Sequence, residues 1–274
     1  TQIAWDELYH TNAIQSDGHA AYFVENRRTN SQHYALNLDF TTLFRGVSLE
    51  YGLRAGLSSD RSFKVVDDLL GARYLLDIDY FVRDDATYAT KYRNNLQSSD
   101  LEVVSGEHFG YDYRLSQLSV SAYGVARWQK WDMDFEMGVE LSTATTHRRG
   151  YFEKELFSGS RSYGRSRAVN LFPARFNLAW NYDFGCHVLD AKLLVSSNTP
   201  KAELLFLQPQ YNNRLTDNPS LGRCFAFEVG YGIVRHRFSL DATLYTSYYA
   251  NECDMLHYYD DLAGEYVDAE DVQD

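Results

Sequence analysis

The chain has no apolar run that approaches the ~18 residues of a membrane-spanning helix. It is also short of proline, with 4 among 274 residues, and proline is the residue that strand interiors tolerate least. Basic residues are in the minority, with 26 Lys and Arg against 38 Asp and Glu and a net charge of -12. This balance argues against a nucleic-acid-binding protein, because phosphate recognition requires clustered lysine and arginine.

Cysteine is scarce, and the chain contains only Cys186, Cys224 and Cys253. None of the three lies in CxxC spacing, so neither a zinc site nor a thioredoxin-type motif is indicated. Cys224 and Cys253 fall near the same end of a predicted hairpin. A disulfide between them and free thiols both stay open, and the odd count and spacing favour free thiols.

Catalytic motifs are missing as well. The 8 histidines are scattered along the chain, and none stands in an HExxH arrangement. The sequence has no GxSxG motif, no Walker loop and no GxGxxG that opens a helix. We therefore expect a protein with no enzymatic activity, no cofactor and no metal site.

The sequence is rich in aromatic residues, with 22 Tyr and 16 Phe, and four pairs of its segments alternate strictly between apolar and polar residues. Alternation with a period of two indicates β-strands with one apolar face, and it keeps the mean hydropathy low, at -0.44. The predicted strands are 33–44 with 47–58, 116–128 with 131–143, 172–182 with 187–196, and 224–233 with 237–248.

Within each predicted hairpin, one register sorts both strands at once into an apolar and a polar face. In the first hairpin Phe44 pairs with Val47 across the turn Arg45-Gly46. A slip of one residue would move every side chain to the opposite face, so this agreement is stronger than alternation alone. The same sorting closes the other three hairpins at Gln129-Lys130, at Asp183 to Cys186 and at Val234 to Arg237.

The two faces differ in charge. The polar faces carry Glu50, Arg54, Arg127, Asp132, Asp134, Glu136, Glu140, Arg175 and Lys192. Because a charge facing lipid costs ~2–4 kcal/mol at the membrane midplane, we expect these residues to face water and the apolar side to face outer-membrane lipid. Aromatic residues that prefer the level of the lipid headgroups flank the turns, namely Phe44, Trp128, Trp131, Trp180, Tyr182 and Phe238.

The connections alternate between very short turns and the long segments 59–115, 144–170 and 197–223. Structureless loops beyond ~12–15 residues are uncommon in compact domains unless they are functional. Short periplasmic turns and long extracellular loops are the arrangement of an outer-membrane barrel. The predicted fold is all-β, an antiparallel up-and-down transmembrane β-barrel segment of about eight strands in the cell outer membrane of a Gram-negative type.

The long segments hold the remaining charged clusters. In 59–115 the acidic residues are Asp67-Asp68, Asp77-Ile78-Asp79 and Asp84-Asp85, and their spacing favours a solvated loop over a Ca²⁺ or acid/base site. The spacing of apolar residues in Ser62 to Leu70 predicts a short helix. The segment 1–32 reads as loop. In 144–170 we favour a solvated basic loop over an anion-binding site for Arg148, Arg149, Arg161 and Arg165.

Two motifs near the fourth hairpin carry a resemblance. Phe206-Leu207-Gln208-Pro209-Gln210-Tyr211-Asn212-Asn213 and Asn218-Pro219-Ser220-Leu221 lead into the strand Phe225-Ala226-Phe227-Glu228-Val229-Gly230-Tyr231. This passage resembles the loop-to-strand passage in the barrel of TonB-dependent outer-membrane receptors, although the Lys-Pro-Glu that often follows is lacking. The stretches 67–79 and 109–113 are similar to an extracellular loop in one branch of that family.

The resemblance implies a barrel of about 22 strands occluded by a plug domain. Residues 1–274 would form part of that barrel, in its C-terminal half, without the plug and the terminal strand. The full receptor would bind a small nutrient ligand, such as an iron chelate, cobalamin or a glycan, and import it with energy transmitted through TonB. The residues that bind the nutrient stay unknown at this stage.

Two other interpretations keep the strands but change the class. The chain would be either a complete small eight-stranded outer-membrane barrel, acting as an adhesin or an enzyme, or a soluble β-sandwich that binds a ligand in its loops. Closure of the sheet discriminates the first, since eight strands are enough to close. The soluble β-sandwich predicts instead that the purified chain stays soluble without detergent.

Overall fold

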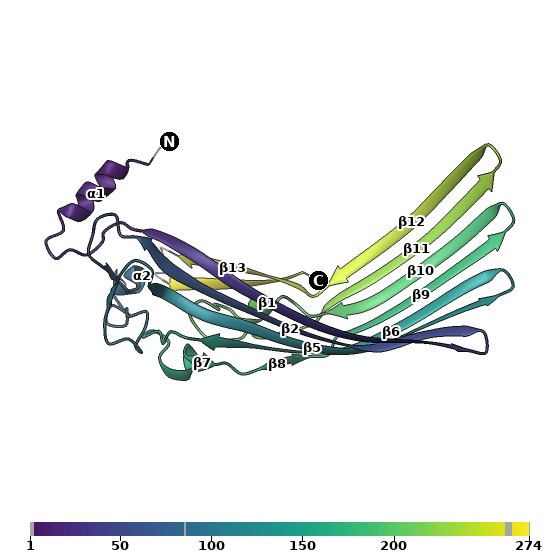
Figure 1. Cartoon of the computed structure of the whole chain (residues 1–274), viewed down its shortest axis with the longest axis horizontal. Coiled ribbons are helices and arrows are strands. Elements are labelled where there is room, and N and C mark those ends of the chain that lie inside the picture. The colour runs from purple at the N-terminus through teal and green to yellow at the C-terminus, as the bar shows by residue number, and fades with distance from the viewer. Residues whose placement is uncertain (1–2, 85, 261–264, 274) are drawn as a thin grey trace.

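The computed structural model describes residues 3–84, 86–260 and 265–273, with side chains up to residue 251. One twisted antiparallel sheet of ten strands dominates it and forms the long curved wall in Figure 1. Its long strands lie in chain order, β1-β2-β5-β6-β9-β10-β11-β12, and the short strands β7 and β8 pair with β6. The predicted all-β, antiparallel, up-and-down architecture is confirmed.

The long strands form four hairpins that all close on two-residue turns at one end of the wall (Figure 1). The pairs are β1 (Val24–Phe44) with β2 (Val47–Asp68), β5 (His108–Lys130) with β6 (Met133–Gly150), β9 (Ala174–Phe184) with β10 (His187–Asn198), and β11 (Gly222–Arg235) with β12 (Phe238–Ala250). We call the opposite end of the wall the loop end.

Most of the smaller elements belong to the connections at the loop end. The helices are α1 (Trp5–Ala13), α2 (Tyr80–Asp84), η1 (Gly159–Arg161) and η2 (Ala202–Leu205). The short strands are β3 (Leu75–Leu76), β4 (Glu102–Val103), β7 (Gly164–Arg165) and β8 (Val169–Leu171), and a separate hairpin joins β13 (Glu252–Asp260) to β14 (Glu265–Gln273). In the described residues no helix is long and apolar enough to cross a membrane.

Two local predictions were wrong because the first hairpins extend well past their alternating segments. The predicted loop 1–32 contains α1 and the first nine residues of β1, and the predicted helix from Ser62 to Leu70 lies largely in β2. Polar residues follow one another in this part of β1, from Asn26 to Gln32, and all pair with β2. The period of two fades where neither face must be apolar, but backbone pairing continues the strand.

The register of the first hairpin is confirmed, and the other three are shifted by an even number of residues. Phe44 pairs with Val47 as predicted, whereas Trp128 pairs with Phe135 rather than with Trp131. Face sorting fixes only whether the shift is odd or even, so a two- or four-residue error leaves both faces intact. The turn sets the absolute register, and at Trp131-Asp132 both residues have positive φ, of 54° and 60°.

The third and fourth hairpins show the smaller form of the same error. Tyr182 pairs with Leu189 instead of His187, and Ile233 pairs with Leu240 instead of Phe238. Both turns are two residues long rather than four, and the third includes Gly185 with φ of 81°. Glycine adopts this left-handed conformation without steric cost, so the strands can pair one step further toward the turn.

The apolar positions of all eight long strands lie on one continuous face. Between hairpins Leu53 pairs with Ala122, and Phe135 pairs with Trp180. Many side chains on this face are exposed, among them Tyr34, Leu36, Leu38, Phe40, Tyr51, Leu118, Val120, Val139, Leu141, Phe225, Phe227 and Leu244. The accessible surface is 17448 Å², compared with about 12,000 Å² for a compact monomer of this mass. The wall therefore leaves a broad apolar surface uncovered.

The buried hydrophobic clusters lie at the loop end rather than along the wall. One contains Ala20, Val66, Leu69, Leu75 and Phe109. The other contains Tyr113, Leu115, Val169, Leu205 and Phe206. The first residue of the 206–213 motif is therefore part of a buried hydrophobic cluster. The long connections are thus packed structures rather than open loops.

The sheet is open in the described residues. β1 and β12 are the two ends of the strand order, and neither pairs with the other. In this part of the chain no second sheet covers the apolar face of the long strands, because side chains such as Leu36, Leu141 and Leu244 are exposed there. A closed eight-stranded barrel and a β-sandwich are therefore not the arrangement observed.

The register of the second hairpin predicts which cysteine pairs can form a disulfide. Ala126→Cys with Met137→Cys places two cysteines directly opposite each other, where Cα atoms are ~5 Å apart. Ala126→Cys with Met133→Cys, the pair expected from sequence sorting alone, separates the cysteines by ~13 Å. We expect oxidation to cross-link only the first pair, as seen by mass spectrometry with each single variant as control. Cross-linking of the second pair alone would refute the observed register.

Candidate functional site

The charged residues predicted for the polar face do share one side of the sheet, and they pair across strands. Arg127 donates from Nη1 to Glu50 at 2.9 Å and from Nε to Glu136 at 2.7 Å. Asn177 on β9 donates to the other oxygen of Glu136 at 3.2 Å. A chain of polar contacts therefore crosses β2, β5, β6 and β9.

Further contacts extend this polar face along the strands. Lys192 Nζ lies 2.8 Å from Glu228, and Tyr123 donates to Asp39. These ion pairs are partly exposed, and such pairs contribute at most about 1 kcal/mol each. Their importance is that they keep charge on one side of the wall. Asp132 is the exception to the prediction, because it lies in a turn and not on this face.

The acidic residues of 59–115 are not one cluster. Asp67, Asp68 and Asp84 are exposed as predicted, and Asp85 lies outside the described residues. The prediction of a solvated acidic loop was wrong for Asp77, because its side chain is buried. In the described residues no group of three or more His, Cys, Asp or Glu is arranged to hold a metal ion.

The prediction of a solvated basic loop was wrong for Arg148, which is buried. Arg149, Arg161 and Arg165 are exposed as expected. Only 1% of Arg148 is exposed. It donates to the carbonyls of Pro209 and Ser162 and to Asn213 Oδ1, at 2.5, 2.8 and 2.6 Å. Arg148 thus ties two loops to β6, which is a structural role. Cys224 is buried, whereas the side chain of Cys253, with which it was considered to pair, lies outside the described residues.

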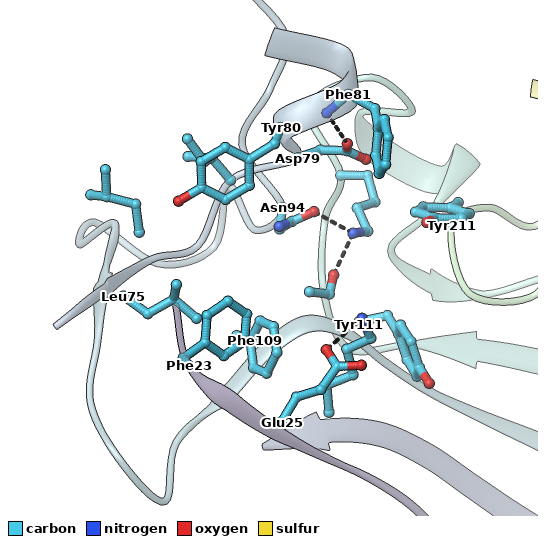
Figure 2. A pocket seen from close by; sticks show the side chains of 15 residues that line it. Phe23, Glu25, Leu75, Asp79, Tyr80, Phe81, Asn94, Phe109, Tyr111 and Tyr211 are labelled. Carbon is cyan, nitrogen blue, oxygen red and sulfur yellow. Dashed lines mark hydrogen bonds and ion pairs between the residues drawn. The ribbon is translucent and has the colours of Figure 1, made fainter. Parts of the chain in front are cut away.

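The loop end contains a pocket of about 180 Å³, shown in Figure 2. Its walls come from segments that are far apart in the chain: the start of β1, the end of β2, the 75–81 segment, Asn94, the start of β5, Lys154 and Tyr211. Six of the lining side chains are aromatic, namely Phe23, Tyr80, Phe81, Phe109, Tyr111 and Tyr211. The rings of Phe23 and Phe109 meet edge to face, with centroids 5.3 Å apart.

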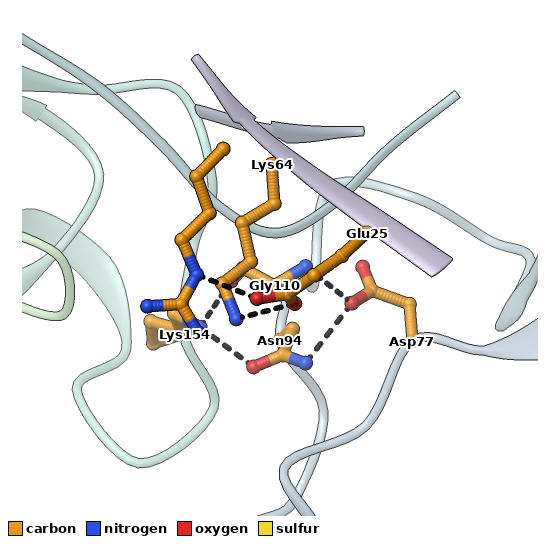
Figure 3. A network of polar contacts seen from close by, with 7 residues as sticks. Glu25, Lys64, Asp77, Asn94, Gly110 and Lys154 are labelled. Carbon is orange, nitrogen blue, oxygen red and sulfur yellow. Dashed lines mark hydrogen bonds and ion pairs between the residues drawn. The ribbon is translucent and has the colours of Figure 1, made fainter. Parts of the chain in front are cut away.

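Lys154 brings a buried cation to this pocket (Figure 3). Only 5% of Lys154 is exposed, and its Nζ donates to Asn94 Oδ1 at 2.6 Å and to the carbonyl oxygen of Gly110. The ring centroid of Tyr211 lies 5.0 Å from Nζ. Burial lowers the pKa of Lys154 to about 8, because the charged form loses its hydration.

Asp77 completes the buried network from the other side (Figure 3). Its Oδ1 accepts from Asn94 Nδ2 at 2.9 Å and from the Gly110 amide at 2.8 Å. Asn94 therefore stands between the ammonium of Lys154 and the carboxyl of Asp77. Burial raises the pKa of Asp77, and these hydrogen bonds and Lys154 only partly oppose that effect.

A second pair of charges lies beside the pocket. Lys64 Nζ is 2.9 Å from Glu25, which also accepts from Arg27 at 2.5 Å. Hydrogen bonds from both cations lower the pKa of Glu25 below its ordinary value, although burial works in the opposite direction. Glu25 is therefore already neutralised by its own partners.

Sequence reasoning missed Lys154 and Asn94. Each is a single polar residue in a connection, with no spacing pattern that marks it. Only the folded connections bring 77, 94, 110 and 154 together. The pair of aspartates at 77 and 79 was the one visible signal, and their roles differ, since Asp79 accepts from the amides of Phe81 and Val82 at the start of α2.

No family model and no curated protein matches the chain. Among solved structures the chain is similar to the copper transporter OprC, with a TM-score of 0.59 at 12% sequence identity. The match covers 90% of this chain and 34% of that chain, so this chain spans about a third of the transporter's length. At this identity the similarity establishes the fold of the wall.

The pKa of Lys154 predicts a pH dependence for the loop end. Between pH of about 8 and 10.5, the ordinary pKa of a lysine, Lys154 binds a proton in the unfolded loop but not in the folded loop. The stability of the folded loop therefore rises with pH in this window. Across this window the free energy of unfolding rises by about 3 kcal/mol, since each unit of pKa difference corresponds to 1.36 kcal/mol. We expect near-ultraviolet circular dichroism of the natural full-length protein in detergent to show a loop-end melting temperature that rises from pH 7.5 to 9.5.

The control is Lys154→Met, which keeps every tyrosine and removes the titrating group. Its melting temperature should lack this rise, so the difference between the two curves isolates Lys154. Parallel curves for both proteins would show that Lys154 titrates at its ordinary pKa.

Proposed function

We propose that this chain forms part of the barrel wall of an outer-membrane TonB-dependent receptor that imports a scarce nutrient. The observation that carries the proposal is the uncovered apolar face shared by all eight long strands. Exposed apolar patches on soluble monomers rarely exceed a few hundred Å². A face of this extent is stable next to hydrocarbon, and a charged face on the other side of the same strands suits a water-filled barrel interior.

The ends of the wall support the same orientation. Ring contacts cluster near the two-residue turns: Trp128 stacks on Phe135 at 5.3 Å, and Tyr182 stacks on Phe184 at 5.0 Å. Aromatic rings favour the interface between lipid and water, which suits turns in the periplasm. The packed loop end would then lie outside the cell, where a nutrient arrives, and its pocket would be accessible from there.

The polar face supports an interior that holds another polar body. The linked residues Glu50, Arg127, Glu136 and Asn177 present both signs of charge along the inside of the wall. A plug domain that fills the barrel would meet this surface. Movement of such a plug, driven through TonB, would open a route through the barrel. A receptor that imports an iron chelate, cobalamin or a glycan needs such a route.

Spin labels at adjacent positions test which face meets lipid. Leu53→Cys and Arg54→Cys differ by one residue, so their side chains point to opposite sides of β2. In liposomes, with the natural cysteines replaced, we expect the label at 53 to collide mainly with dissolved oxygen and the label at 54 mainly with a water-soluble nickel complex. Equal exposure of both labels to the nickel complex would refute a membrane wall.

Uptake assays test the transport part of the proposal. We expect a strain that lacks this protein and a strain that lacks TonB to lose uptake of the same nutrient, because the receptor takes its energy through TonB. Iron chelates, cobalamin and glycans would be supplied one at a time in labelled form. Uptake that depends on this protein but persists without TonB would indicate a passive channel.

A further inference from the structure

The loop-end pocket has the size of a single ring. Its volume is about 180 Å³, and an apolar cavity of ~150 Å³ is sufficient for benzene. Drug-sized ligands occupy pockets of ~300–1,000 Å³, so a larger molecule would enter only in part. The space therefore accommodates one six-membered ring with a small substituent.

The walls favour a flat apolar ring. Phe23, Phe109 and Tyr111 contribute ring faces or edges, and Leu75 and Ile78 add aliphatic surface. Offset-stacked and edge-to-face contacts between aromatic rings stabilise a complex beyond the burial of apolar area. A ring that enters between these side chains would gain such contacts on more than one side.

The remaining feature is the ammonium group of Lys154. It has three N–H donors, and the two described acceptors, Asn94 Oδ1 and the Gly110 carbonyl, are neutral. Among the described residues no carboxylate lies within ion-pair distance of it, whereas Lys64 and Arg27 both pair with Glu25. The attraction of the more distant Asp77 and Asp79 offsets only part of the cost of burying this cation, and an entering anion would lower that cost further through a charge-assisted hydrogen bond.

The other carboxylates near Lys154 are held in place by their own partners. Asp77 is separated from Lys154 by Asn94, which bonds to both. Asp79 accepts two amide hydrogens at the start of α2. Neither carboxylate therefore pairs directly with the ammonium, whose two described hydrogen-bond acceptors are both neutral.

We infer that the pocket binds a small aromatic carboxylate, with its carboxylate on Lys154 and its ring between the aromatic walls. The inference rests on the proposed function only in placing the loop end outside the cell, where such a molecule or a group of that kind on a larger nutrient arrives. The ligand class itself follows from the volume, the walls and the buried ammonium.

Binding of benzoate to the natural full-length protein in detergent micelles tests this inference. Benzamide has nearly the same shape without the charge, and glucose offers a neutral ring with hydroxyl groups. We expect calorimetry at pH 7 to give a Kd for benzoate at least about tenfold below that for benzamide, as one charge-assisted hydrogen bond would produce. Equal binding of benzoate and benzamide, tighter binding of glucose, or no binding of benzoate would overturn the inference.

Variants separate the roles of charge and space. Lys154→Met keeps the length of the side chain and should remove the preference for benzoate while leaving benzamide binding in place. Leu76→Trp should fill the pocket and abolish binding of both, with the buried cation retained. Lys201→Met removes an exposed lysine outside the pocket and should change neither Kd. Strand content by circular dichroism identifies a variant that fails to fold, and in that case the other variant decides.

These results are independent of the membrane proposal. Benzoate binding is measured in micelles without transport, so its failure leaves the spin-label and uptake results standing. Conversely, a water-exposed label at Leu53 would refute the membrane wall even if benzoate binds. A Lys154→Met variant that still prefers benzoate to the same degree would refute the assigned role of the ammonium.

Discussion

The structure depends on one constraint: each long strand must pair its backbone with the strands beside it while sending apolar and polar side chains to opposite faces. Pairs such as Leu53 with Ala122 and Phe135 with Trp180 carry this sorting from one hairpin to the next. Because the side-chain period is two, a sorted strand forces its neighbour to be sorted in the same sense. The continuous apolar face and the charged face with Arg127 at its centre are both consequences of that rule.

The rule ends where the wall reaches the loop end, and ordinary packing takes over. Here β1 continues, paired with β2, through a run of polar residues, and the buried clusters form around Val66 and Phe206. The same packing buries Lys154 and Asp77 with an amide between them. Desolvation raises the pKa of Asp77 and lowers the pKa of Lys154, so both shifts favour the neutral form of the side chain. The free-energy cost of burying charged groups is therefore concentrated at the pocket of the loop end.

Much of the wall could be predicted from the sequence, and the site could not. Alternation identified all eight long strands, and sorting assigned the face of residues such as Glu50 and Lys192 correctly. The absolute register failed in three hairpins because sorting is blind to even shifts, and turn conformations such as that of Trp131-Asp132 decide it. Arg148 was wrongly assigned to a solvated loop and Lys154 was missed, because the burial of a single basic residue has no signature in the sequence.

The sequence by itself determined the strand class, the number of long strands and which side chains share a face, because these follow from a period of two within each segment. The tertiary structure alone decided the turn residues, the length of the strand extensions and the pocket. Those depend on backbone dihedral angles and on contacts between segments as distant as Asp77, Asn94 and Lys154. Local periodicity contains no information about such contacts, since they arise only when the connections pack against one another.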